Sequence, residues 1–142
     1  MERKILWIGM IVLVGFLVLA VVTTLNKQNE FNGVEISPAP AAPDFSSLTS
    51  QDGQSIELEN YKDRVVLLFF GYTSCPDICP ATMGRLKQVV ADLGDNKDNV
   101  VVMMITTDPE RDTREQLGNY LGNFDQSFLG LTGPISELEK TW

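Results

Sequence analysis

The sequence predicts a mixed α/β domain behind an N-terminal transmembrane helix. Two apolar runs, Val65–Tyr72 and Val100–Thr107, are typical of strands in a parallel sheet that is buried on both faces. The segment between these runs repeats apolar residues at helical spacing, which predicts a helix covering the sheet. The transmembrane helix is predicted because residues 5–25 carry no charge, and a bilayer core needs about 20 such residues.

The first element is this anchor, residues 5–25, which follows a short basic segment at residues 1–4. Arg3 and Lys4 precede the apolar run, so the positive-inside rule places the N-terminus in the cytoplasm and exports the rest. This predicts a single-pass protein of the cytoplasmic (inner) membrane with an extracytoplasmic, periplasmic domain. A cleaved signal peptide is the alternative, but its apolar core is usually shorter, and no A-x-A site follows this one.

A tether is expected next, at residues 26–43, before a domain at residues 44–142. Three prolines stand among alanines in the tether, and the segment lacks apolar periodicity. Such a composition favours a semi-extended chain that holds the domain away from the membrane surface.

The domain begins with "FSSLTSQDGQSIEL", which predicts two short strands joined at the turn Asp52-Gly53. The strand Val65–Tyr72 follows, then a helix that ends at Gly94, then the strand Val100–Thr107. Together these three elements form a βαβ unit with a right-handed crossover. The helix has one apolar face, made of Met83, Leu86, Val89, Val90 and Leu93.

The last third of the sequence predicts a helix that begins at residues 112–115, which resemble a capping box. A third strand is predicted after it, in "SFLGL". Another helix starts near Ser136, and the sequence stops at Trp142, one or two turns into it. No strand remains to complete the far edge of the sheet. We therefore expect a domain that is cut short and incomplete at its C-terminal edge.

The chain has two cysteines, Cys75 and Cys79, within "CPDICP". Proline is favoured at the first position of a helix and costs about 3 kcal/mol or more in its interior, so we expect Pro80 to be the first helical residue. The cysteines then lie on a turn at a helix N-terminus, beyond the carboxyl end of a buried strand. The helix dipole favours thiolates there, and two soft thiolates suit copper(I).

Two other roles for the cysteines are weaker. A structural disulfide between Cys75 and Cys79 would close only a very short loop, so it would stabilise the fold little. Buried inert thiols do not fit an exposed turn containing Pro76 and Asp77. Because the chain contains no histidine, a Cys-His nucleophile and a Cys/His metal cluster are also excluded unless another chain supplies the imidazole.

The loop "TTDPERDT" follows the second parallel strand and is expected at the same edge of the sheet as the cysteines. Asp108 is either an outer-shell or partner-facing carboxylate or simply a cap of this turn, and the sequence leaves both open. Asp112 is expected only to cap the turn. Met103 and Met104 lie within the buried strand, where core packing is favoured over metal binding.

The formal charge of −8 argues against binding nucleic acid, because phosphates need a basic face, and against lying on anionic lipid. Contact with a membrane is expected only through the N-terminal helix.

The motifs "GYTSCPDICPATM" and "TTDPERDTREQLGNYLGNFDQSFLGLTG" resemble the Sco/SenC family. The resemblance implies a thioredoxin-like fold and a membrane-anchored copper chaperone for the binuclear copper site of cytochrome c oxidase. It implies that Cys75 and Cys79 are the copper-binding, redox-active pair, and that Asp108 belongs to a loop typical of the family. The family's third copper ligand is a histidine on a later segment, which is absent from this chain.

Three functions follow from the resemblance and the thiol pair. The first is copper delivery to the copper-site subunit of the oxidase, with other thiol-redox or copper-carrier proteins as further partners. The second is a thiol-disulfide oxidoreductase that reduces the cysteines of the oxidase copper site. The third is a peroxiredoxin-like peroxidase, in which Cys75 attacks peroxide and Cys79 resolves it. The tight CPDICP turn favours a symmetric pair over an attacking and a resolving thiol, which argues against the peroxidase. Thioredoxin-like folds host both of the other functions, so the fold does not decide between them, and an enzyme stays the second choice after the metallochaperone.

Overall fold

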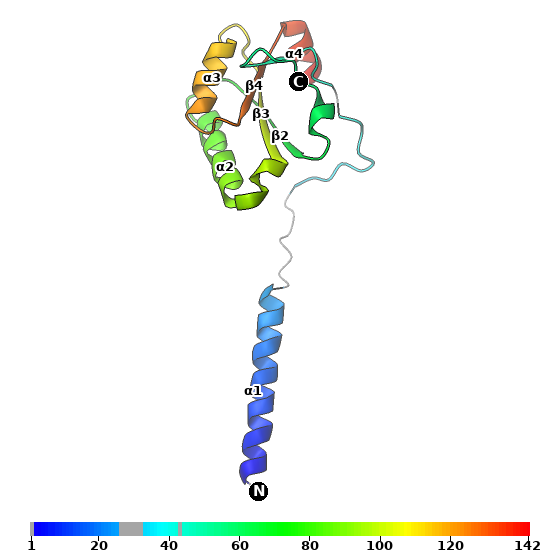
Figure 1. The fold of residues 1–142 in the computed structure, drawn as a ribbon, viewed down its shortest axis with the longest axis vertical. Coiled ribbons are helices and arrows are strands. Elements are labelled where there is room, and N and C mark those ends of the chain that lie inside the picture. The colour runs from blue at the N-terminus through cyan, green and yellow to red at the C-terminus, as the bar shows by residue number, and fades with distance from the viewer. Residues whose placement is uncertain (1, 26–32, 43) are drawn as a thin grey trace. The chain divides into compact units, whose positions relative to one another are not determined.

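The computed structural model describes residues 2–25, 33–42 and 44–142. The chain divides into two compact units, Met1–Pro40 and Ala41–Trp142 (Figure 1). In the first unit, α1 (Glu2–Leu25) is a helix of 24 residues, and its side chains from Trp7 to Thr23 are exposed. Within the described part of the chain, no helix reaches the length and apolar character that crossing a membrane requires.

The helix predicted over residues 5–25 is therefore present. The structure does not identify it, among the described residues, as a membrane-spanning helix. Of the predicted tether, residues 26–32 and 43 lie outside the described residues. Residues 33–42 contain neither helix nor strand.

The second unit is built on a four-stranded sheet with the strand order β1-β4-β3-β2 among the described residues. At its centre, β3 (Val100–Thr106) pairs in parallel with β2 (Val65–Gly71) over seven residues. On the other side of β3 lies β4 (Leu129–Thr132), also parallel, and β1 (Thr49–Ser50) pairs antiparallel with β4. The carboxyl ends of β2, β3 and β4 therefore meet at one edge of the sheet.

Two helices cover one face of this sheet (Figure 1). The crossover helix α2 (Ile78–Asp92) joins β2 to β3, and α3 (Arg114–Gly122) joins β3 to β4. After α2, Gly94 adopts a positive φ of 55°, which ends the helix as predicted, and the short 3-10 helix η2 (Gly94–Asn99) follows. The core on this face contains Met83, Val90, Val102, Met104, Leu121 and Phe128.

The other face packs against α4 (Ile135–Thr141), the 3-10 helix η1 (Leu58–Tyr61) and the segment before β1. Its core contains Phe45, Leu48, Ile56, Val101, Met103, Ile105, Leu131 and Leu138. As expected, Met103 and Met104 are fully buried, one on each face of β3. Every residue of β3 after Val100 is buried, which confirms that strand's prediction.

Two details of the predicted fold are wrong. The strand β2 is not buried on both faces, because Leu68 and Phe70 are 42% and 43% exposed where no described element covers this edge strand. The predicted hairpin is reduced to β1 and an isolated bridge between Thr49 and Ser55. Its turn is present, with Gly53 at a φ of 81°.

Candidate functional site

The cysteine turn connects the end of β2 to the start of α2. The helix begins at Ile78, two residues earlier than predicted, so Cys79 is its second residue and Pro80 its third. Proline is still tolerated there, because the first N–H groups of a helix have no intrahelical acceptor. The first backbone hydrogen bond of this helix runs from Ala81 N to Asp77 O, at 3.1 Å. The predicted placement of the thiols at a helix N-terminus is retained with this shift.

The Cys79 sulfur and the Phe69 ring both lie close to the backbone of Gly71. Gly71 ends β2, and a Cβ atom at this position would lie 3.1 Å from Cys79 Sγ and 2.5 Å from the Phe69 ring. With any side chain at this position, the Phe69 ring or the Cys79 sulfur would have to shift. Gly71 is therefore a residue of the site that spacing alone did not identify.

The two thiols occupy different environments. Cys79 is 5% exposed, whereas Cys75 is partly exposed on the turn, and neither forms a disulfide. The backbone N–H of Cys79 donates to Cys75 Sγ at 3.4 Å. The two sulfurs are thus held close to each other, with Cys75 on the accessible side.

These environments separate the acidities of the two thiols. A hydrogen bond from the Cys79 side chain, with backbone hydrogen bonds from Asp77 and Cys79, lowers the pKa of Cys75 from 9.0 to about 7. Burial raises the pKa of Cys79, and the neighbouring Cys75 raises it further. Cys75 is therefore the thiol of the pair that ionises near neutral pH, and Cys79 stays the less acidic thiol.

Tyr72 is a second residue of the site that the sequence did not single out. Its hydroxyl forms a hydrogen bond with Cys75, which contributes to the lowered pKa of that thiol. In turn, the charge and hydrogen bond of Cys75 raise the pKa of Tyr72. A phenol that remains protonated is a donor toward the thiolate.

Asp112 links the cysteine turn to the loop after β3, which corrects the expectation that it only caps a turn. Its carboxylate is fully buried and accepts hydrogen bonds from Thr73 N at 3.1 Å, Thr73 Oγ1 at 2.6 Å and Thr106 Oγ1 at 2.6 Å. Thr113, the next residue, caps α3 by accepting from Gln116 N. Asp112 therefore fixes the two loops at the carboxyl ends of β2 and β3 relative to each other.

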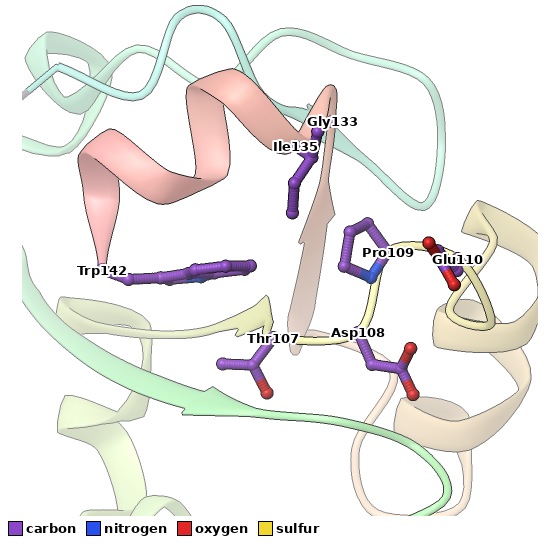
Figure 2. Close-up of a pocket in the computed structure, with 7 residues that line it drawn as sticks. All are labelled: Thr107, Asp108, Pro109, Glu110, Gly133, Ile135 and Trp142. Atoms are coloured by element: carbon purple, nitrogen blue, oxygen red, sulfur yellow. The ribbon is translucent and has the colours of Figure 1, made fainter.

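Asp108 lies at the same edge, where among the described residues its carboxylate pairs with Arg111 rather than with either thiol. Its Oδ2 accepts from Arg111 Nε at 2.5 Å, and its backbone N–H donates to Thr106 Oγ1 at 2.9 Å. With Glu110, Ile135 and Trp142 it lines a cavity of about 470 Å³ (Figure 2). The carboxylate is mostly covered, with 18% of its side chain exposed. The carboxylate pairs with the Arg111 side chain, and both the turn-capping and the partner-facing interpretations of Asp108 stay predictions.

The donor set at the turn consists of two sulfurs. No group of three or more histidine, cysteine, aspartate or glutamate side chains suited to a metal ion occurs among the described residues. Two adjacent thiols, one of them readily ionised, fit a soft monovalent ion and leave further coordination positions open. They do not form a closed structural metal site.

Comparisons with known proteins place these features in a family context. The sequence model of the family described as SCO1/SenC matches residues 34–142. An SCO2-like protein from Rickettsia prowazekii is 40% identical over 86 residues, covering 61% of this chain and 42% of that protein. The mixed α/β fold matches ScoI from Bradyrhizobium japonicum, solved with copper bound, at a TM-score of 0.63 and 39% identity, covering 66% of this chain and 60% of that one.

A third match is BsSco, described as having a disulfide switch and as a member of the Sco family of cytochrome c oxidase assembly proteins. It is 26% identical with a TM-score of 0.56, and the match covers 72% of this chain and 64% of that one. The chain spans between 32% and 66% of the length of eight curated relatives that it matches.

Proposed function

The chain belongs to the SCO1/SenC family, and on this premise we propose that it carries copper(I) on Cys75 and Cys79 for the assembly of cytochrome c oxidase. The observation that carries the proposal is the pair of free thiols at the start of α2, with Cys79 N–H donating to Cys75 Sγ. The copper-bound state of the related ScoI structure supports copper as the cargo.

The chemistry of the pair suits a cargo that must be released. Cys75, with a pKa of about 7, supplies a thiolate at neutral pH without a large proton cost. Cys79 Sγ becomes the second donor when the ion displaces its proton. The partly exposed Cys75 holds copper(I) at the surface of the turn, where a recipient's ligands can reach it.

The proposed recipient is the copper-site subunit of cytochrome c oxidase. Support comes from the description of BsSco as belonging to a family of cytochrome c oxidase assembly proteins. The partly exposed Cys75, flanked by the exposed residues Pro76 and Ile78, gives such a partner access to the metal. Other thiol-redox or copper-carrier proteins are further proposed partners.

We also propose that α1 anchors the protein in the cytoplasmic membrane, with the domain from residue 44 on the periplasmic side. The support is in the sequence, where residues 5–25 carry no charge and a bilayer core needs about 20 such residues in a helix. Arg3 and Lys4 before the apolar run favour a cytoplasmic N-terminus.

A second candidate function is a thiol-disulfide oxidoreductase that reduces the cysteines of the oxidase copper site. The unequal thiols favour it, since an accessible Cys75 with a lowered pKa attacks and a buried Cys79 resolves. The copper and reductase functions use the same two residues. They differ in whether a metal or a mixed disulfide forms with the recipient.

X-ray absorption on the reduced protein loaded with copper(I) tests the proposal. We expect one copper ion per chain with sulfur neighbours in its first coordination sphere. A first sphere of only nitrogen and oxygen, or no copper retained after desalting, would exclude the thiol pair as the copper site. Trapping of a mixed disulfide through Cys75 in the absence of copper would favour the reductase instead.

A further inference from the structure

The cysteine turn is tied to the rest of the domain by the residue that stands two positions before Cys75. This residue is Thr73, and its hydroxyl donates to Asp112 Oδ1 at 2.6 Å. Its backbone N–H donates to the same carboxylate, at 3.1 Å from Oδ2 and 3.3 Å from Oδ1. Both donors of Thr73 therefore point at one buried acceptor, which lies outside the segment that connects β2 to α2.

Asp112 is a rigid anchor for these bonds. Its side chain is fully buried, and its Oδ2 also accepts from the hydroxyl of Thr106, the last residue of β3, at 2.6 Å. Its backbone N–H donates to Asp108 O at 2.9 Å, and the next residue, Thr113, is the N-cap of α3. A buried carboxylate whose two oxygens both accept hydrogen bonds has little freedom to move. The anchor is thus held by β3 and α3 and not by the cysteine turn.

The two sulfurs depend on this anchor to different degrees. Cys79 is the second residue of α2, and its sulfur lies close to the backbone of Gly71, so the helix and the strand hold it in place. Cys75 precedes the helix, and its backbone N–H donates to Tyr72 O at 3.3 Å. Thr73 lies inside this short turn. The position of Cys75 relative to Cys79 therefore depends on where Thr73 is held.

We propose that Thr73 is a positioning residue, whose hydroxyl bond to Asp112 holds Cys75 where it can act jointly with Cys79. Two groups that are held side by side react or chelate as if each were present at high concentration near the other, because their relative motion has already been lost. The structure shows this arrangement in the free thiols, where Cys75 Sγ accepts from Cys79 N at 3.4 Å. The proposal rests on the proposed function, in which both sulfurs bind one ion.

Closure of the Cys75–Cys79 disulfide by glutathione disulfide measures the joint action of the thiols without any metal. One thiolate of the pair attacks glutathione disulfide, which forms a mixed disulfide and releases the first glutathione. The other thiolate attacks the protein sulfur of the mixed disulfide and releases the second glutathione. Two protein thiols are oxidised, glutathione disulfide is reduced, and the two protons pass to the two glutathione molecules. The equilibrium constant gives the effective concentration of one thiol beside the other.

This equilibrium is measured on the full chain in wild type and Thr73→Val, by acid quenching, alkylation and mass spectrometry. Valine keeps the size and branching of threonine and removes only the hydroxyl, so we expect the effective concentration to fall about fivefold. Thr73→Ser restores the hydroxyl and should return to the wild-type value. Thr49→Val is the matched control and should leave the value unchanged. The Thr49 hydroxyl donates to Thr132 O at 3.4 Å, on the strand β1 at the sheet edge opposite β2.

Three results would overturn the proposal. The first is a wild-type effective concentration in Thr73→Val. The second is an equal fall in Thr49→Val, which would indicate a general loosening of the fold. The third is a value for Thr73→Ser as low as that of Thr73→Val, which would assign the effect to the lost methyl group. None of these results decides whether the thiols bind copper(I), because the equilibrium is metal-free and the cysteine variants test metal binding separately.

Discussion

The two cysteines are four positions apart in the sequence but are chemically unequal. Cys75 is partly exposed, has a pKa of about 7 and accepts a hydrogen bond from Cys79 N–H. Cys79 is buried, and burial raises its pKa. Cys75 is therefore ready to react or to bind a metal near neutral pH. Cys79 becomes a donor only when its proton is removed, for example by an incoming metal ion.

The acidity of Cys75 predicts the pH dependence of its alkylation. The lowered pKa means that the thiolate is lost as the pH falls through about 7, so the rate of reaction with iodoacetamide should rise with pH to a midpoint near 7. In Cys79→Ala the largest cause of the lowered pKa is removed, and the midpoint should move upward. Mass spectrometry of the labelled residue provides the rates. A midpoint near 9 in the wild type would contradict the proposed environment of Cys75.

Asp112 determines how the two loops of the site meet. Replacing it with alanine leaves the Thr73 N–H and the hydroxyls of Thr73 and Thr106 without their acceptor. We expect Asp112→Ala to lower the free energy of unfolding by about 2–4 kcal/mol in urea denaturation. Asp108→Ala is the comparison, since that carboxylate pairs with the exposed Arg111 and should cost about 1 kcal/mol or less. Equal effects of the two variants would refute the bridging role.

The sequence predicted the thiol pair but not its surroundings. Cysteines and prolines at a strand-to-helix junction indicate a reactive turn by chemistry and spacing alone. Asp112 is different, because its partners Thr73 and Thr106 become neighbours only when β2 and β3 pair. Tyr72 acts on Cys75 through a hydrogen bond, which spacing along the chain does not encode.

At the scale of elements, the βαβ unit of β2, α2 and β3 places the site. Its strands were predictable because their apolar runs have no polar alternation, and α2 because of its apolar face and the stop at Gly94. The burial of β2 was not predictable from its composition, because a strand at the centre of a sheet and one at its edge can carry the same residues. Leu68 and Phe70 are exposed because β2 lies at the edge.

The junction between β2 and α2 depends on Gly71. In Gly71→Ala the added methyl group meets the Phe69 ring and Cys79 Sγ, so either the ring or the first turn of α2 must shift. We expect a loss of about 1–3 kcal/mol in the free energy of unfolding, together with a raised reactivity of Cys79 toward thiol reagents. Gly84→Ala is the control, because its Cβ would meet nothing within 4 Å and alanine favours a helix. Destabilisation by both variants alike would argue against the close approach at Gly71.

At the scale of the whole molecule, the proposed topology places the thiols outside the cytoplasm. A membrane-impermeant maleimide applied to intact cells, or to spheroplasts where an outer membrane is present, should label Cys75 after reduction. In Cys75→Ser the labelling should fall sharply, because Cys79 is buried. Labelling of the wild type only after lysis would contradict the proposed orientation.

The acidic charge of the molecule, −8 in total, is compatible with a protein partner that presents a basic surface. Charge steers such an encounter but does not move the metal. The proposed transfer of copper depends on the two sulfurs acting together.

A copper(I) competition titration on the reduced protein tests this joint action most directly. Wild type, Cys75→Ser and Cys79→Ser are each titrated against a chromophoric copper(I) chelator. We predict one tightly held copper ion in the wild type, and an affinity lower by at least about a hundredfold in each serine variant, because a single thiolate cannot chelate. A serine variant that keeps the wild-type affinity would contradict the paired-thiol copper site.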